Sequence, residues 1–281
     1  MLKIAVPNKG ALAESAAQML AEAGYRQRRN PKDLVTLDPD NDVEFFYLRP
    51  RDIAIYVGEG TLDVGVTGRD LLLDSRAHAT ENIALGFGAS TFRFAAPIGT
   101  MSTISDLEGA RIATSYEGIV ETYLAERGIS ADVVRLDGAV ESSVRLGVAD
   151  AIADVVETGS TLRQADLEVF GDPILSSEAV LITRQDAPEP DGFAVFKRRL
   201  DSVIVARTYV MMDYDIRVDQ VEKAVELTPG IESPTVSPLH REGWVAVRSM
   251  VPRESAQKVM DLLFGLGARG ILVTDILACR I

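Results

Sequence analysis

The sequence contains few of the residues on which metal centres and disulfide bonds depend. There is one cysteine, Cys279, among 281 residues, so no internal disulfide can form. The two histidines, His78 and His240, are far apart in the chain and do not supply a Cys/His metal site. Zinc binding and thiol redox chemistry are therefore not expected.

Long apolar stretches and an excess of positive charge are also missing. No run approaches the roughly 20 apolar residues that cross a bilayer, and the first ten residues contain no signal-peptide core or cleavage site. We therefore expect a cytoplasmic protein with no membrane partner. The net charge of −13 disfavours nucleic-acid binding, which requires a basic face. A small anionic substrate remains compatible, because a few local cations and backbone N–H groups can hold it.

The length and composition are those of a globular protein with more than one domain. A hydrophobic fraction of 47% and a charged fraction of 25% are close to the averages for soluble proteins. Because domains usually contain about 100 to 200 residues, 281 residues predict two or three compact units.

Strand and helix patterns alternate over the first 160 residues. Residues 2–6 predict a strand, Pro7-Asn8-Lys9-Gly10 a loop, and residues 11–23 a helix. Further strands are predicted at 43–48, 62–68, 92–97, 111–115 and 151–159. Helices are predicted at 50–57, in a segment that begins at residue 69, and in another segment that ends near residue 128. Such alternation predicts a mostly parallel sheet with helices on both faces.

Residues 52–70 and 140–162 contain the same predicted elements in the same order. In each, a helix reaches a glycine, an aspartate precedes a strand, and Thr-Gly opens the next helix. Two α/β lobes facing each other across a cleft explain this similarity, and chance resemblance between two ordinary βα units is the alternative. We assign residues 1–90 to the first lobe, completed by about 184–200, and residues 91–183 to the second.

A different architecture follows the Pro- and acid-rich surface connection at residues 185–193. Strands are predicted at 203–216, 234–239, 244–252 and 271–277, and helices at 217–228 and 254–267. The order βαββαβ is that of the ferredoxin-like fold, which predicts a third domain at residues 203–281.

The segment from Glu141 to Leu162 gives the clearest indication of a ligand-binding site. An apolar strand ends near Asp154 and is followed by Thr158-Gly159-Ser160-Thr161. Unpaired N–H groups at a helix start, a glycine and hydroxyl side chains can hold a sugar phosphate, and Asp154 can accept hydrogen bonds from ribose hydroxyls. The alternative is that this loop only caps a helix.

The pattern E-x5-G-x-A-x2-I-x-D-x3-T-G-x-T-L over residues 141–162 resembles the signature of ATP phosphoribosyltransferases. Similar segments cover nearly the whole chain, at residues 5–10, 45–57, 64–70, 85–88, 112–116 and 213–215. The C-terminal βαββαβ order is typical of the long, histidine-regulated form. The resemblance implies two α/β lobes around a cleft, like type II periplasmic binding proteins, with a C-terminal ferredoxin-like domain.

The resemblance also implies a reaction and its residues. Adenine N1 of ATP displaces pyrophosphate from C1 of phosphoribosyl pyrophosphate, with Mg²⁺ as cofactor, in the first step of histidine biosynthesis. Lys9, Arg49 and Asp154 are the implied catalytic residues, and Glu141 and Asp154 the candidate magnesium ligands. Phosphoribosyl pyrophosphate is assigned to Glu141, Asp154, Val155, Glu157, Thr158, Gly159, Ser160 and Thr161, and ATP to Lys9, Gly10, Arg49, Arg69, Asp70 and Tyr116.

Several of these assignments have simpler alternatives. Lys9 and Arg49 follow predicted strands, where α/β sheets bind ligands, but each alone can be a solvated surface cation. Asp70 can be a helix cap. Tyr116 can stack on adenine, but Glu117-Gly118 follows it here, where the family commonly has Pro-Asn.

The C-terminal domain is expected to bind histidine as an inhibitor. The resemblance implies a histidine site at Asp215, Ile231, Ser233, Thr235 and Gly270, a homo-oligomer that passes from dimers to hexamers, and no separate regulatory subunit. Without the resemblance, residues 233–235 are better interpreted as a turn and Asp215 as an acid at a strand end.

Two other functions fit a bilobal chain. One is a non-catalytic small-molecule-binding protein, against which the absence of a signal peptide and of a helix-turn-helix argues. The other is a phosphoribosyltransferase of the common type, which usually has two adjacent acids before its phosphate loop. Here Val155-Val156 follows Asp154.

Overall fold

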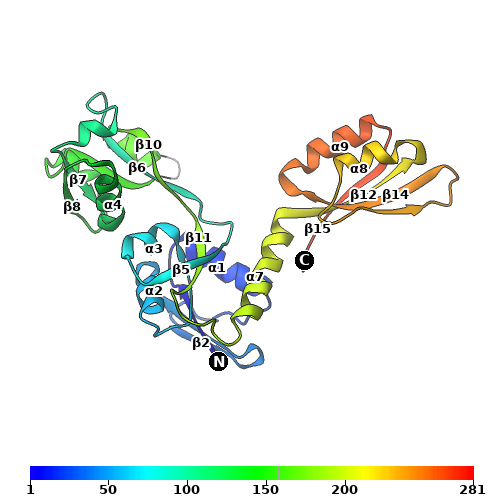
Figure 1. Ribbon diagram of the computed structural model, residues 1–281, viewed down its shortest axis with the longest axis horizontal. Helices are drawn as coiled ribbons and strands as arrows, with labels where there is room; N and C mark the ends of the chain where they lie inside the picture. Colours follow the sequence, from blue (N-terminus) through cyan, green and yellow to red (C-terminus); the bar gives the residue numbers. More distant parts are fainter. Residues whose placement is uncertain (157–158) are drawn as a thin grey trace. The chain divides into compact units, whose positions relative to one another are not determined.

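The chain folds into two compact units in a computed structural model (Figure 1), which describes residues 1–156 and 159–281. The first unit contains Met1–Ala21 and Tyr25–Phe193, and the second contains Glu22–Gly24 and Ala194–Ile281. Within these described residues, no helix has the length and apolar character needed to span a membrane.

The first lobe is built on a six-stranded sheet with the order β2-β3-β1-β4-β11-β5. Strands β3, β1 and β4 are parallel, whereas β2, β11 and β5 pair antiparallel with their neighbours. The strands are β1 (Leu2–Pro7), β2 (Val35–Asp38), β3 (Val43–Leu48), β4 (Val64–Gly68), β5 (Ala79–Ala84) and β11 (Ala179–Arg184), and the helices are α1 (Ala11–Glu22), α2 (Pro50–Gly58) and α3 (Arg69–Ser75). Every residue of β4 is buried, as expected for a central strand covered on both faces.

The second lobe has a five-stranded sheet with the order β10-β6-β9-β7-β8. Strands β9, β7 and β8 are parallel, and β6 and β10 are antiparallel. The strands are β6 (Ser90–Pro97), β7 (Arg111–Thr114), β8 (Asp132–Arg135), β9 (Ala151–Val156) and β10 (Leu167–Ser177), and the helices are α4 (Glu117–Arg127), α5 (Ser142–Arg145) and α6 (Ser160–Gln164). Short 3-10 helices occur at η1 (Pro39–Asn41) and η2 (Ile104–Leu107).

The two lobes share one strand order. The run β3-β1-β4-β11-β5 in the first sheet has the same directions as β8-β7-β9-β6-β10 in the second. The chain crosses between sheets twice, from β5 to β6 and from β10 to β11. The bilobal architecture predicted from the sequence is thereby confirmed. Strand β11 returns to the first sheet at Ala179, so the second lobe ends before the predicted boundary at residue 183.

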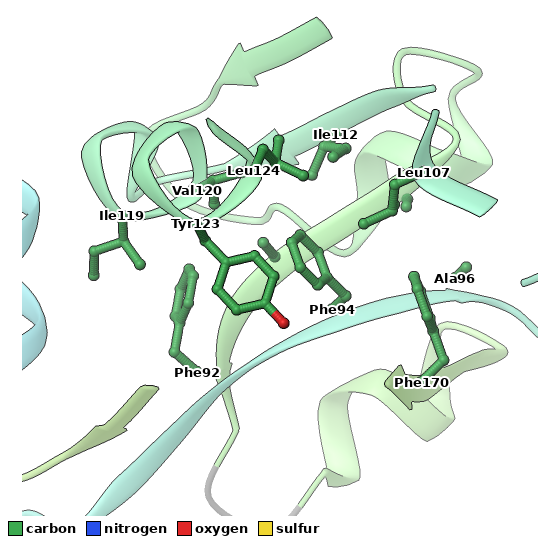
Figure 2. Close-up of a cluster of buried hydrophobic side chains, with 12 residues drawn as sticks. Phe92, Phe94, Ala96, Leu107, Ile112, Ile119, Val120, Tyr123, Leu124 and Phe170 are labelled. Atoms are coloured by element: carbon green, nitrogen blue, oxygen red, sulfur yellow. The ribbon is translucent and has the colours of Figure 1, made fainter. Parts of the chain in front are cut away.

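Aromatic side chains fill the core of the second lobe (Figure 2). Helix α4 contributes Ile119, Val120, Tyr123 and Leu124, which lie on one face of the helix at the spacing of successive turns. They pack against Phe92, Phe94 and Phe170 from strands β6 and β10. The ring of Phe92 also meets Tyr116 edge to face, with 5.1 Å between centroids. The core thus fixes the start of α4 and the residue before it.

The second unit contains α7 (Phe193–Thr208) from Ala194 onward and a four-stranded antiparallel sheet with the order β13-β14-β12-β15. Its elements are β12 (Tyr209–Arg217), η3 (Val218–Gln220), α8 (Val221–Leu227), β13 (Thr235–Pro238), β14 (Trp244–Pro252), η4 (Arg253–Ser255), α9 (Ala256–Gly265) and β15 (Arg269–Asp275). This is the ferredoxin-like βαββαβ order predicted from the sequence.

The predicted strand at 203–216 is wrong over its first six residues. Helix α7 continues to Thr208, and β12 begins at Tyr209. The buried residues Phe196, Leu200 and Val203 recur every three or four positions, which is a helical period. That period overrides the strand preference of the β-branched run at 203–205.

Candidate active site

Asp154 lies near the end of β9, half-buried, with its neighbour Glu141 directly before α5. Burial raises the pKa of Asp154 above the usual value, and the negative charge of Glu141 raises it further. A hydrogen bond from the backbone N–H of Val155 to Oδ1 of Asp154, 2.8 Å long, acts in the opposite direction. Two neighbouring carboxylates in a partly desolvated position are suited to a cation or to sugar hydroxyls.

The predicted phosphate loop follows β9. Gly159 has φ +67°, in the left-handed region that favours glycine, and directly precedes α6. Ser160 and Thr161 are exposed, so both can reach a ligand. The side chain of Val155 instead packs against the core around Phe92, which leaves its backbone as the part available to the site. The predicted ligands Glu157 and Thr158 lie outside the described residues.

Tyr116 brings side chains of both lobes together. Its hydroxyl donates a hydrogen bond to Asp70 of the first lobe, and the guanidinium of Arg51 lies over its ring, 4.9 Å from the centroid. Burial and the charges of Asp70 and Asp154 raise the pKa of the Tyr116 hydroxyl far above its usual value. Tyr116 therefore stays protonated at neutral pH and connects Asp70 to the vicinity of Asp154.

Asp70 is buried, with 8% of its surface exposed. The hydroxyl of Ser177 donates to Asp70 Oδ1 at 2.8 Å, and the backbone N–H of Asp70 donates back to Ser177 Oγ at 3.0 Å. Since Ser177 ends β10, this pair ties α3 to the strand that leads back from the second lobe. Asp70 is thus held rigidly at the lobe junction, beside the predicted adenine site.

Arg69 has carboxylate partners within the protein. Its guanidinium forms ion pairs with Glu81 at 2.7 Å and with Glu178 at 3.4 Å. Its backbone N–H donates to the carbonyl oxygen of Glu178, and the N–H of Gly86 donates to the Glu178 carboxylate. Glu178 therefore joins the two segments that cross between lobes, and the charge of Arg69 is balanced by Glu81 and Glu178.

Lys9, Gly10 and Arg49 lie at the ends of neighbouring strands. Strands β1 and β3 pair in parallel to their last residues, Pro7 and Leu48, so the loops that follow them start side by side. The side chains of Lys9 and Arg49 are exposed, and Gly10 has φ +80° with open space around it. The structure therefore places these three residues at one sheet edge, as predicted for α/β ligand sites.

Arg93 is a cation near the site that sequence reasoning missed. It lies opposite Asp154 in the antiparallel pairing of β6 with β9, donates to the carbonyl of Gly171 at 2.6 Å, and has a buried Nε without a partner among the described residues. Paired residues of neighbouring strands lie on one face of a sheet. Only the register of β6 reveals this placement.

Glu141 and Asp154 are a suitable but incomplete magnesium site. Among the described residues, no group of three or more His, Cys, Asp or Glu side chains is arranged to hold a metal. Mg²⁺ usually takes one or two carboxylates and completes its coordination with water and substrate phosphates. Burial, and after it the charge of Glu141, raises the pKa of Asp154, and a cation bound there would favour the ionised carboxylate.

Comparison with known proteins identifies the family. A family model described as ATP phosphoribosyltransferase matches residues 49–204, and one described as HisG, C-terminal domain, matches residues 206–278. ATP phosphoribosyltransferase from Pseudarthrobacter chlorophenolicus is 66% identical over 287 residues, and that from Streptomyces coelicolor is 65% identical over 286, each covering both chains completely. The chain belongs to the ATP phosphoribosyltransferase family.

A solved structure is similar to most of this chain. The ATP phosphoribosyl transferase (HisG:HisZ) complex from Thermotoga maritima contains a chain with 27% identity and a TM-score of 0.64. The match covers 73% of this chain and 98% of that chain. Since the family is one of enzymes, the non-catalytic alternative suggested by the bilobal pattern has no support.

The residues predicted to bind histidine are divided between two places in the C-terminal domain. Ile231, Ser233 and Thr235 line a pocket of about 330 Å³ together with Arg248 and residues 279–281. Asp215 and Gly270 lie close to each other elsewhere on the sheet, on the adjacent strands β12 and β15. The structure thus brings the first three residues together and places the other two outside this pocket.

Proposed function

We propose that this chain transfers the phosphoribosyl group of phosphoribosyl pyrophosphate to N1 of ATP, with release of pyrophosphate, where its two lobes meet. This is the first step of histidine biosynthesis. The observation that supports this location is Tyr116, which joins Asp70 of the first lobe to the surroundings of Asp154, next to the phosphate loop.

The residues of the proposed site have separate roles in the transfer. Asp154 accepts hydrogen bonds from the ribose hydroxyls, and the loop at Gly159 to Thr161 holds the 5-phosphate. The N1–C1 bond forms while the C1–O bond breaks, and the electron pair of that bond leaves with pyrophosphate. Lys9 and Arg49 balance charge on the leaving group, so catalysis depends on positioning and electrostatics, with adenine as the nucleophile.

Magnesium fits this scheme as a cofactor bound mainly through substrate phosphates. Glu141 and Asp154 would hold it, and when bound it neutralises phosphate charge. The remaining chemistry belongs to the protein: Asp154 orients the ribose, and Asp70 with Tyr116 orients the base.

The pH dependence should reflect the raised pKa of Asp154. As pH falls through that pKa the carboxylate is protonated and accepts fewer hydrogen bonds, so we expect kcat/KM to decline at a higher pH than an exposed aspartate would produce. Glu141→Gln removes the neighbouring charge and should move this acid limb to lower pH. Initial rates at low phosphoribosyl pyrophosphate concentration, where kcat/KM reflects the free enzyme, measure both profiles. An acid limb at higher pH in the variant would contradict the assignment.

We further propose that histidine inhibits the enzyme by binding in the C-terminal domain, with a change from dimers to hexamers. The built-in domain makes a separate regulatory subunit unnecessary. Histidine must bind one assembly more tightly than the other, since equal affinity shifts no equilibrium. The pocket lined by Ile231, Ser233 and Thr235 supports this proposal by its size and hydroxyl groups.

Thr235→Val tests the histidine pocket, because it removes one hydroxyl and preserves shape. We expect the half-inhibitory histidine concentration to rise about tenfold, the equivalent of one hydrogen bond of roughly 1.4 kcal/mol. Ser237→Ala, two residues along β13 and outside the pocket, is the matched control. Histidine that neither slows the unaltered enzyme nor shifts its melting temperature would rule out this site.

Pyrophosphate release tests the proposed transfer. Purified protein is mixed with ATP, phosphoribosyl pyrophosphate and Mg²⁺, with inorganic pyrophosphatase added to drive the reaction and to report phosphate. We expect release only when both substrates are present. Absence of release under these conditions would overturn the proposal.

A further inference from the structure

Helix α4 of the second lobe approaches the end of α3 so closely that position 118 has no room for a side chain. A Cβ atom at Gly118 would overlap the backbone oxygen of Asp74. The backbone N–H of Gly118 donates to Asp74 Oδ1 at 2.9 Å, and its carbonyl accepts from Arg76 at 3.2 Å. This glycine is therefore required by the close approach of two lobes.

Asp74 connects this contact to Tyr116. Its side chain is only 9% exposed, and its second oxygen pairs with Arg51 at 2.5 Å. Arg51 in turn lies over the ring of Tyr116. Tyr116 precedes Gly118 by two residues. The contacts from Gly118 to Asp74, to Arg51 and to Tyr116 therefore form a closed ring at the start of α4.

We propose that Arg51, Asp74 and Gly118 form an interlobe latch that holds Tyr116 in place for ATP. The proposal rests on the proposed function, because it takes Tyr116 to contact the adenine. The three are positioning residues that act through Tyr116. The phosphoribosyl loop follows β9, on a different segment of the second lobe. Loss of the latch therefore affects ATP more than phosphoribosyl pyrophosphate.

The surroundings of the latch strengthen it. The ion pair between Asp74 and Arg51 is partly withdrawn from water, with 9% and 35% of the side chains exposed, so it is less screened than a surface pair. Arg76 adds an ion pair to Glu121 at 2.8 Å on the exposed side of the same contact. The charge of Arg51 is thus held between a carboxylate of its own lobe and an aromatic ring of the other lobe.

Gly118→Ala tests the latch directly. The added methyl group must separate α3 from α4, whereas alanine otherwise favours the helix at this position. We expect KM for ATP to rise about tenfold, with kcat and KM for phosphoribosyl pyrophosphate within about twofold. Gly265→Ala is the matched control, since Gly265 is also helical and its Cβ would meet open space.

Variants of Asp74 separate the latch from simple packing. Asp74→Asn keeps an oxygen that accepts the Gly118 N–H, so it should raise KM for ATP less than Asp74→Ala does. If Gly118→Ala and Asp74→Ala leave KM for ATP within twofold, or raise KM for both substrates equally, the latch does not position ATP and the proposal is overturned.

The failure of the latch is distinguishable from failure of the proposed function. Turnover by the unaltered enzyme tests the function alone. Spin labels at two exposed positions, Asp40 in the first lobe and Glu126 in the second, measure the separation of the lobes in a Cys279→Ser background. We expect a longer distance in Gly118→Ala than in Gly265→Ala, and equal distances would contradict the latch even in an active enzyme.

Discussion

Asp154→Asn should lower kcat/KM for phosphoribosyl transfer by about a hundredfold, the order of loss seen when one preorganised polar contact to a reacting group is removed. Asparagine retains the shape of the side chain but loses the charge that, in the proposed function, orients the ribose hydroxyls and helps to hold Mg²⁺. Steady-state rates of pyrophosphate release measure the effect. A variant with more than half of the normal kcat/KM would contradict the assigned role.

The same substitution should stabilise the protein at neutral pH. The pKa of Asp154 is raised in the folded state, so its contribution to stability is present at low pH and is lost as pH rises through that pKa. Removing the charge therefore raises the melting temperature at pH 7 and has little effect below the ordinary pKa of aspartate. An increase in stability together with a loss of activity excludes simple unfolding as the cause.

Asp150→Asn is the matched control at the other end of the same strand. A hydrogen bond and ion pair with Arg111 lower the pKa of Asp150, opposite to the shift at Asp154. Its ionised form thus stabilises the folded state above the unfolded pKa, and this contribution is lost as pH falls through the lowered pKa. Asp150→Asn should slightly lower the melting temperature at pH 7 and leave kcat unchanged.

Phe94→Ala should destabilise the second lobe by about 3 to 5 kcal/mol, the usual cost of removing a buried aromatic side chain. Phe94 is fully buried in the core of Figure 2, with its ring centroid 5.6 Å from that of Tyr123 and 6.0 Å from that of Phe170. Its loss leaves a cavity between β6, α4 and β10. Urea unfolding, monitored by hydrogen exchange of α4 and β6, measures the free energy of unfolding.

Val169→Ala is the control for the core prediction. Val169 lies in the same sheet next to Phe170 but is 41% exposed, so its replacement should cost roughly 0.5 kcal/mol. Equal destabilisation by the two variants would show that Phe94 does not anchor the core. Because the core fixes the start of α4, Phe94→Ala should also weaken ATP binding before the lobe unfolds.

Sequence patterns predicted the parallel strands other than β8, and the C-terminal domain, because those elements alternate locally. Strand β4 and helix α2, for example, are visible from their own residues. The antiparallel strand β11 was not predicted, since it pairs with β4, more than 100 residues earlier in the chain. Residues 203–208 were predicted as a strand because they include β-branched residues, which favour strands. They are helical, and the helical spacing of the buried residues in α7 shows this only in the structure.

The site was predictable where its residues are adjacent in sequence. The order of Asp154, Gly159 and Thr161 predicts a phosphate loop without any structure, and that role stays a prediction. The meeting of Tyr116 with Asp70 and Arg51 depends on how the lobes contact each other, and no local pattern encodes it. The pairing of Arg69 with two glutamates likewise requires the fold, because Glu178 lies 109 residues away.

The identity of the product tests the central claim most directly. Pyrophosphate could also come from hydrolysis of phosphoribosyl pyrophosphate, so release alone does not show transfer to ATP. Phosphoribosyl pyrophosphate labelled with ¹³C at C1 is incubated with ATP, Mg²⁺ and the enzyme, and the products are analysed by mass spectrometry and NMR. We predict one adduct of ATP with ribose 5-phosphate, with the labelled carbon bonded to N1 of adenine. Labelled ribose 5-phosphate with unmodified ATP would contradict the account.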